Sequence, residues 1–260
     1  MAYKYELHLH TCLGSACAVA HGQEYITHYK KLGYQGIFVT DHFYLGNSCV
    51  DRRLAWEDWV NAYCKGYEEL KRLGDEQGLS VFFGWETTYD GDDFLYYGLN
   101  KEWLLAHGDI IHWDHKRCYE EVKKAGGFVI QAHPFRERDY IDTIHLHPHQ
   151  CDAFEIANAG NMAYQDLSAY RYAKLHKIPM TCGSDIHSTK GHIADRPFAL
   201  VTEEVIETEK DLGRIILSGK YSLNYPEERL SGTFKKPAIP VLLHDEENAG
   251  HAYDLSEIAY

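Results

Sequence analysis

Apolar and polar positions along the chain alternate between short strand-like runs and longer helix-like segments. The clearest helical pattern is the series Trp56, Val60, Tyr63, Tyr67 and Leu70, whose spacing of three and four residues places one apolar stripe on a helix. The helix-like segments cover residues 22–33, 54–77, 114–125, 162–176 and 203–218. The strand-like runs are Tyr3–His10, Gly36–His42, Ser80–Thr88, Phe94–Asn100, Phe128–His133, Ala153–Asn158, Met180–Asp185 and Phe198–Val201.

Glycine and proline mark the ends of these predicted helices, at Gly33, Gly78, Gly126, Pro179 and Gly219. Alternation of strands and helices over this length predicts parallel strands covered by helices. The sequence contains no internal repeat, low-complexity tract or long linker, so we predict that residues 1–225 form one barrel domain. Residues 226–260 mix proline, glycine and charge, and we predict a C-terminal extension that packs on the barrel or trails from it.

Composition narrows the functional classes. The chain has 260 residues and a formal net charge of -13, which argues against an extended nucleic-acid-binding surface but permits a phosphorylated ligand at a local positive site. No apolar run approaches the roughly 18 residues needed to span a membrane, and the N-terminus resembles a strand rather than a signal peptide. The 7 cysteines form no CxxC pair, which suits reduced thiols and predicts a cytoplasmic protein. No sequence feature indicates an oligomeric state.

The chain contains 17 histidines, and several of them stand at the ends of predicted strands. The strand-end residues with metal-ligand chemistry are His8, His10, Asp41, His42, Glu86, Asn100, His133, Asp185 and His187. In a parallel barrel the carboxyl ends of all strands open on one face, so residues far apart in the sequence converge there. Each histidine alone has an ordinary alternative, as a strand-end or surface residue. The joint pattern predicts a metal cluster.

Spacing within the strands supports this prediction. His8 and His10 are two residues apart, so their imidazoles point to the same side of a strand and can hold one cation. Asp185 and His187 repeat that spacing with a carboxylate. Asp41 and His42 are adjacent and point to opposite sides, so we expect one to bind metal and the other, Asp41, to support the ligands through hydrogen bonds.

Five segments together resemble the polymerase-and-histidinol-phosphatase (PHP) superfamily of metal-dependent phosphoesterases, most closely its stand-alone bacterial histidinol-phosphatase-related members. They are Glu6–Thr11, Thr40–His42, Gly84–Glu86, Gln131–Arg136 and Gly183–His187, and they occur in the family order. The resemblance covers about residues 3–201. It implies an α/β fold, a distorted (β/α)7 TIM-like barrel, with two or three divalent transition-metal ions at the strand ends.

The resemblance also implies which residues hold each ion. The first metal would be held by His8, His10, Glu86 and Asp185. The second would share Glu86 and be completed by His133 and the residue at position 100. The third would be held by His42 and His187, with a further ligand from the loop that follows His10.

The chain departs from the family pattern at two of these positions. Asn100 stands where the family often has histidine, and an amide oxygen is a weaker ligand than imidazole for a borderline metal. Cys17 stands where the family often has histidine or aspartate. It binds as a thiolate or is simply a small loop residue.

Imidazole and carboxylate ligands suit zinc, iron or manganese. A hydroxide bridging such metals would attack phosphorus in line with the leaving alcohol, so we predict a phosphatase, a phosphoric monoester hydrolase, for a small phosphorylated substrate. Histidinol phosphate is one candidate; a nucleotide or a phosphopeptide is another. The alternatives are an amidohydrolase-like metal-dependent hydrolase and a non-catalytic PHP-type metal-binding module. The sequence lacks a Cys-x5-Arg loop and a Gly-x-Ser-x-Gly elbow, so no covalent nucleophile is indicated.

Other polar residues have weaker signals. Arg136 follows His133 at the same strand end and is predicted to bind substrate phosphate, the alternative being a surface ion pair with Glu137 or Asp139. His192, after His187, is either an acid for the leaving group or a solvated loop histidine.

A second set of histidines lies between the predicted strands. His145, His147 and His149 alternate, but Pro148 interrupts them and no family motif matches. We predict a polar loop there, with metal binding as the alternative. His115, in a helix-connecting stretch, is predicted to lie on the surface.

Overall fold

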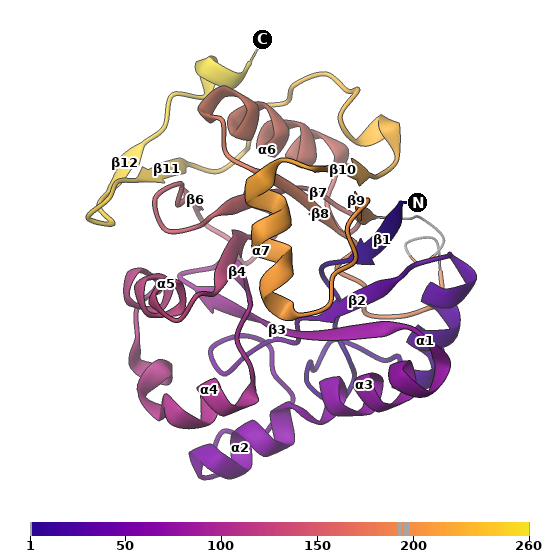
Figure 1. Ribbon diagram of the computed structural model, residues 1–260. Coiled ribbons are helices and arrows are strands. Elements are labelled where there is room, and N and C mark those ends of the chain that lie inside the picture. The colour runs from indigo at the N-terminus through magenta and orange to yellow at the C-terminus, as the bar shows by residue number, and fades with distance from the viewer. Residues whose placement is uncertain (1, 192–193, 195–197, 260) are drawn as a thin grey trace.

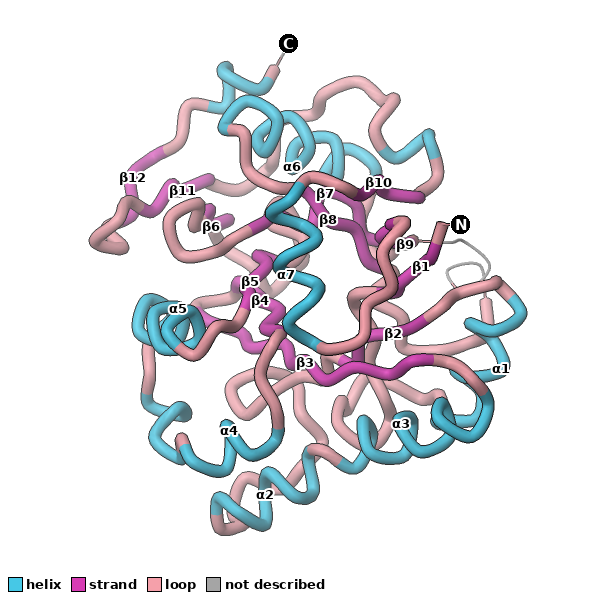
Figure 2. Tube along the Cα trace, viewed as in Figure 1, coloured by secondary structure: helices cyan, strands magenta, loops and turns pink. Residues whose placement is uncertain are grey.

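A strongly bent mixed sheet surrounded by helices forms the protein in the computed structural model, which describes residues 2–191, 194 and 198–259 (Figure 1). The strands are β1 (Tyr3–Glu6), β2 (Gly36–Val39), β3 (Ser80–Tyr89), β4 (Asp92–Tyr97), β5 (Phe128–Gln131), β6 (Ile144–Leu146), β7 (Ala153–Asn158), β8 (Met180–Gly183), β9 (Ala199–Thr202), β10 (Tyr221–Asn224), β11 (Val241–His244) and β12 (Gly250–Ala252). Figure 2 shows the strands of the larger sheet in the interior with helices around them, and β11 and β12 at the left edge of the view.

The α-helices fall mostly between consecutive strands, as the sequence predicts. They are α1 (Gly22–Lys31), α2 (Trp56–Tyr63), α3 (Lys65–Gln77), α4 (Lys101–Ala106), α5 (His115–Lys124), α6 (Ala163–His176) and α7 (Glu209–Ser218). Short 3-10 turns are η1 (Gly108–His112), η2 (Glu227–Arg229) and η3 (Leu255–Ile258).

The larger sheet is almost closed into a barrel. Its strands follow the order β10-β9-β1-β2-β3-β4-β5-β7-β8. Beyond β1 and β8 the chain completes the circle, because Leu9 pairs in parallel with Ile186 and the His10 amide donates to the Ile186 carbonyl at 3.0 Å. The predicted distorted TIM-like barrel is confirmed.

The prediction of parallel strands is wrong for β4, which runs antiparallel to both β3 and β5, and for β9, which runs antiparallel to β1 and β10. For β4 the reason is a two-residue hairpin turn, Asp90-Gly91, which joins Tyr89 to its partner Asp92. Both turn residues have positive φ, 50° and 94°, as a type I′ turn requires. The reversal puts the start of β4, rather than its end, at the mouth of the barrel.

The single helix predicted over residues 54–77 is divided into α2 and α3 at Cys64. Just after the break, Gly66 brings the helix backbone against Thr11, so close that an added Cβ would lie 2.1 Å from Thr11 Oγ1. Trp59 and Tyr63 of α2 are fully buried against Phe43, with ring centroids 5.1 and 5.3 Å from it. Their helical spacing therefore serves core packing.

The C-terminal residues 226–260 contact the barrel domain at several points. β11 pairs in parallel with β6, and β12 pairs with β11. Val241 and Ile258 are buried in the main hydrophobic core, and buried Arg229 forms a 3.0 Å ion pair with Asp166. The division of the chain at residue 225 stays a prediction. Within the described residues, no helix combines the length and apolar character that crossing a membrane would take.

Candidate metal centre

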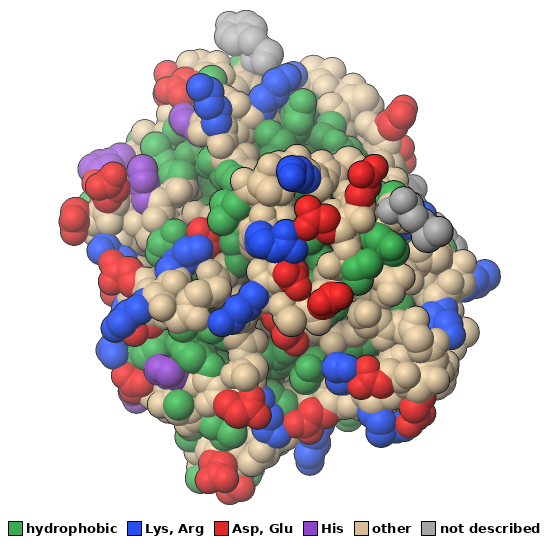
Figure 3. Space-filling view, in the orientation of Figure 1, with side chains coloured by type: hydrophobic (Ala, Val, Ile, Leu, Met, Phe, Trp, Pro, Cys, Tyr) green, Lys and Arg blue, Asp and Glu red, His purple; other side chains and the backbone are tan. Residues whose placement is uncertain are grey.

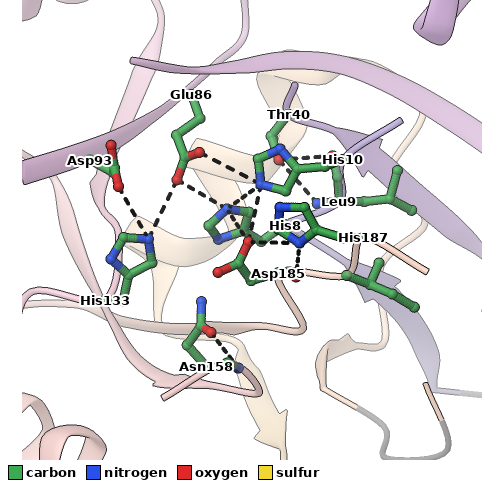
Figure 4. Close-up of polar contacts among 12 residues, drawn as sticks. His8, Leu9, His10, Thr40, Glu86, Asp93, His133, Asn158, Asp185 and His187 are labelled. Carbon is green, nitrogen blue, oxygen red and sulfur yellow. Dashed lines mark hydrogen bonds and ion pairs between the residues drawn. The ribbon is translucent and has the colours of Figure 1, made fainter. Parts of the chain in front are cut away.

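The histidines and carboxylates of the predicted strand ends meet at one mouth of the barrel. The structure brings together seven predicted ligands, which we call the barrel-mouth cluster: His8, His10, His42, Glu86, His133, Asp185 and His187. Figure 4 shows Glu86 between His133 on one side and His8 and His10 on the other. An open cavity of about 470 Å³ lies over the cluster and is lined by His42, Glu86, His133, Asp185 and His187 among others.

His8 and His10 face each other through their Nε2 atoms, which are 3.1 Å apart. Nδ1 of His8 lies 3.0 Å from the carboxylate of Glu155, so that nitrogen carries the donated proton. Nδ1 of His10 lies 3.1 Å from Ser15 Oγ, whose own proton goes to Asp41, so His10 also donates from Nδ1. In both rings Nε2 is therefore the nitrogen left for a metal.

Glu86 stands at the centre of the cluster with its two oxygens directed at different histidines. Oε1 lies 3.2 Å from His8 Nε2 and 3.5 Å from His133 Nε2. Oε2 lies 2.6 Å from His42 Nδ1. Both oxygens are buried and make no hydrogen bond of accepted geometry to any described residue. A carboxylate with both oxygens so placed can bridge two cations.

Asp185 and His187 close the cluster from the end of β8. Asp185 Oδ1 is 3.1 Å from His10 Nε2, and its other oxygen accepts a 2.8 Å hydrogen bond from Arg136. The His187 ring stacks on His10 at 4.4 Å and its Nδ1 donates to the Asp185 carbonyl, which leaves its Nε2 without that proton. Both Asp185 and His133 have positive φ, 52° and 31°, in the left-handed region.

Three overlapping sets of ligand atoms result, each with its atoms within 4.8 Å of one another. They are His8, His10 and Asp185; His8, Glu86 and His133; and His10, His42 and His187. Imidazole nitrogen combined with carboxylate oxygen is the ligand chemistry of zinc, iron and manganese. The residues present therefore fit divalent cations.

The electrostatics of the cluster favour positive charge at its centre. Burial opposes ionisation, but His42 and His8 outweigh it and hold the pKa of Glu86 well below its usual range. Burial likewise opposes protonation of His42, yet Glu86 and Cys17 raise the pKa of that imidazole to about 11. Protons on the histidines thus neutralise the carboxylates, and bound cations would replace those protons.

Cys17 lies where the resemblance places the loop ligand. It lines the same cavity as His42 and His187. Burial opposes ionisation of the thiol, but hydrogen bonds to His187 and His42 outweigh burial and lower its pKa to about 6. At neutral pH Cys17 is therefore mainly a thiolate, the form that binds metals.

The structure does not bring Asn100 to the cluster, which corrects that prediction. Its exposed side chain caps α4 by accepting from the Trp103 amide at 3.0 Å. Because β4 is antiparallel, Asn100 follows the strand at the opposite end of the barrel. Asp93, near the start of β4, lies at the mouth instead, with Oδ2 3.7 Å from His133 Nε2. The Asp90-Gly91 hairpin signal was the clue to this reversal.

Two buried carboxylates, Asp41 and Glu155, support the predicted ligands through hydrogen bonds. Asp41 accepts hydrogen bonds from the Thr11 amide at 2.6 Å and from Ser15 Oγ at 2.7 Å, and Ser15 in turn contacts His10. Burial raises the pKa of Asp41 to about 6 against these hydrogen bonds. Glu155, which the sequence prediction missed, contacts His8 and accepts from the His133 amide at 3.0 Å. A lone charge inside the apolar strand Ala153–Asn158 was its available signal.

Arg136 lies at the cavity wall, nearly buried. Its guanidinium donates to Asp185 at 2.8 Å, to Asn158 at 2.8 Å and to Asn161 at 2.7 Å. The surface ion pair with Glu137 or Asp139, the alternative that the sequence left open, does not form among the described contacts. His192 falls outside the described residues.

Comparison with known proteins identifies the fold. No family model and no curated protein matches this chain. Among solved structures, it is similar to a two-domain protein from Bacteroides vulgatus ATCC 8482 that contains a predicted PHP-like metal-dependent phosphoesterase. The TM-score is 0.63 with 16% identity over 86% of this chain, which spans 65% of the length of that protein. The barrel has a PHP-type fold.

A second solved structure agrees over most of both chains. PsfC from Pseudomonas syringae PB-5123 is similar with a TM-score of 0.56 and 14% identity, covering 88% of this chain and 93% of that one. The TM-scores establish a shared fold, and identities this low leave function to be argued from the site itself.

Proposed function

We propose that this protein is a metal-dependent phosphoesterase of the PHP superfamily that hydrolyses phosphate monoesters of a small molecule. One observation carries the proposal: imidazole nitrogens and carboxylate oxygens from several strand ends converge in three overlapping sets at the barrel mouth. The 3.1 Å approach of two Nε2 atoms, and the two oxygens of buried Glu86 directed at His8, His42 and His133, are what a site shaped around cations would show. The PHP-type fold supports the same assignment.

The proposed ligands follow the three sets of atoms. His8, His10, Glu86 and Asp185 would hold one ion, and Glu86 would bridge it to a second held by His133. Asp93 takes the position at the mouth that was expected of residue 100. His42, His187 and the Cys17 thiolate would hold a third. When bound, two or three ions of zinc, iron or manganese would neutralise phosphate charge and activate water for attack.

The chain's own groups would orient these components. Asp41 acts through Ser15, and Glu155 acts directly, to keep Nε2 of His10 and His8 directed inward. Arg136 fixes Asp185 and adds positive charge to the cavity wall, where it would attract a phosphate group. A cavity of about 470 Å³ is of the size that holds a small molecule, so histidinol phosphate and nucleotides remain reasonable substrates.

The test combines metal analysis with hydrolysis of an aryl phosphate. We expect the purified protein to carry two or three transition-metal ions, to lose activity on chelation and to regain it with manganese or zinc. Replacing Asp185→Asn should remove most of this activity. Less than one ion per chain, with no activity after adding either metal, would contradict the proposal. A panel of phosphorylated metabolites then identifies the substrate.

The same panel separates the alternatives. Hydrolysis of amides but not phosphates would favour an amidohydrolase-like enzyme. Full metal content without turnover of any substrate would favour a non-catalytic binding module.

A further inference from the structure

Three histidines meet at a second place, where the C-terminal strands join the barrel domain. His145 lies on β6, His147 follows β6 directly, and His244 ends β11; we call these three residues the tail cluster. β6 and β11 pair in parallel with Leu243 opposite Leu146, which sets His244 beside His147. Their rings stack 4.1 Å apart at 20°. Figure 3 shows histidine side chains gathered on the surface where β11 and β12 lie in Figure 1.

The ring nitrogens of this cluster are arranged as metal ligands are. His145 Nδ1 and His244 Nε2 are 2.8 Å apart. His244 Nδ1 donates to the Asn248 carbonyl at 3.1 Å, so its Nε2 keeps a lone pair directed at His145. One nitrogen from each of the three rings lies within 4.8 Å of the others. A backbone carbonyl that holds the outer N–H of a histidine is the usual support of a metal-bound imidazole.

Five buried polar atoms in or beside the cluster have no hydrogen-bond partner among the described residues. They are Nδ1 of His147, Oδ2 of Asp92, Nε2 of His115, Oδ1 of Asn248 and Oε1 of Gln150. His147 is only 6% exposed, and its Nε2 lies 4.0 Å from Asp92 Oδ2. A cation on Nδ1 would satisfy that nitrogen and make Nε2–H a stronger donor toward the Asp92 carboxylate, so one ion accounts for two of these atoms.

There is room for an ion and its water beside these rings. A cavity of about 200 Å³ is lined by the three histidines together with Asp90, His115 and Asn248. Burial, followed by His244 and His145, lowers the pKa of His147, which agrees with the buried surroundings of this ring. His115 is buried here too, contrary to its predicted surface position.

We propose that the tail cluster binds one divalent transition-metal ion of the kind that prefers imidazole, with zinc as its representative. A set of three imidazole ligands favours zinc, nickel or copper over magnesium, calcium or manganese. The bound ion would link β11 to β6 and thereby fix residues 241–252 to the barrel domain. The inference is independent of the proposed phosphoesterase activity, since it uses none of the barrel-mouth residues.

The experiment counts zinc in matched variants. Wild type, His244→Asn and the control His149→Asn are treated with chelator, dialysed against Zn²⁺ and then against buffer, and analysed for metal. His149 is an exposed histidine of the same segment outside the cluster. We expect His244→Asn to hold one zinc ion fewer than wild type and to keep the same aryl-phosphatase rate, while the control matches wild type in both. Equal zinc content in wild type and folded His244→Asn would overturn the proposal.

A second variant and a direct measurement guard against a variant that fails to fold. His145→Gln alters a partly exposed side chain and should also lose one ion. Anomalous scattering at the zinc edge from Zn²⁺-soaked wild-type crystals should show a peak bonded to His145 and His244. Absence of that peak, with ions present at the barrel mouth, would show that the histidines are only a hydrogen-bonded pair and would overturn the proposal.

Discussion

The barrel-mouth cluster and the tail cluster are both built from histidines far apart in the sequence, yet their electrostatics are opposite. At the mouth, Glu86, Asp185 and Glu155 contact the imidazoles, and the pKa of His8 is raised well above its usual value because these carboxylates outweigh burial. In the tail cluster the only contact between a ring and a carboxylate of the described residues is a long one, 4.0 Å from His147 Nε2 to Asp92, and burial with neighbouring imidazoles lowers the pKa of His145 and His147. The close carboxylates at the mouth thus distinguish a site suited to chemistry from one suited to holding strands together.

The start of strand β4 lies between the two clusters. β4 begins with Asp92 and Asp93, whose side chains point to opposite faces as strand neighbours do. Asp93 faces His133 of the mouth at 3.7 Å, whereas Asp92 faces His147 of the tail cluster at 4.0 Å. The antiparallel hairpin therefore supplies one carboxylate to each side.

The largest expected effect on activity comes from removing the negative charge of Glu86 at the centre of the barrel-mouth cluster. Glu86→Gln keeps the shape but loses the carboxylate that faces His8, His42 and His133, so metal binding and charge balance fail together. We expect aryl-phosphatase activity to fall by more than about 10³-fold, beyond the loss of a single oxyanion donor. Steady-state kinetics with metal analysis measure this. If His244→Asn reduced activity equally, the two clusters would not be separate.

The second prediction tests the contact between Glu155 and Nδ1 of His8. Glu155→Ala removes the acceptor for His8 Nδ1, and we expect metal affinity or activity to drop about 10–100-fold, as for other partners of metal-bound histidines. Glu155→Gln retains an oxygen acceptor and should recover part of the loss. Metal titration and kcat of both variants give the comparison; identical losses would mean that Glu155 does not orient His8.

Cys17 provides a pH-dependent test of the mouth. With a pKa of about 6, the thiol of chelator-treated protein should be alkylated half-maximally near pH 6, since the thiolate is the reactive form. Cys49 is also exposed, but burial and Asp41 raise its pKa, so at pH 7 it should react at least about tenfold more slowly. Peptide mass spectrometry after iodoacetamide treatment measures both rates.

Two results bear on this test. Protection of Cys17 by added zinc would support its role as a ligand. Alkylation of Cys17 that still rises above pH 8 would show that His42 and His187 do not stabilise the thiolate.

The smallest expected effect is on the pH dependence of folding stability, measured at the tail cluster in metal-free protein. Folding lowers the pKa of His147 from 6.5 to about 3, so between these values the unfolded chain binds a proton that the folded chain does not. Stability is then fully present above pH 6.5 and falls as the pH drops. His147→Gln should make this slope shallower by at most about 1.4 kcal/mol per pH unit. Urea unfolding of chelator-treated protein measures it, with His149→Gln as the unchanged control.

The local sequence pattern predicted which side chains meet at the barrel mouth, because these residues stand at strand ends. His8, Glu86, His133 and Asp185 each follow a short apolar run, and barrel geometry then brings such ends together. The same reasoning misplaced Asn100 and missed Asp93, since it assumed parallel strands where a two-residue turn reverses the chain.

Local pattern offered metal binding at His145 and His147 only as the alternative to a polar loop, and it did not include His244. Formation of the tail cluster depends on β11 pairing with β6 across about a hundred residues, and nothing in either three- or four-residue strand specifies that partner. The break of the predicted helix at Cys64 has a similar origin, in the approach of Gly66 to Thr11. Both are consequences of tertiary contacts.

The left-handed backbone of His133 and Asp185 has an evolutionary consequence. Left-handed backbone costs most residues about 1–2 kcal/mol and aspartate less, and glycine would relieve the strain at either position. Selection for metal binding is what would keep imidazole and carboxylate there. In a descendant that no longer needed the metals, drift toward glycine at these two positions would raise stability, and such a substitution would date the loss of the site.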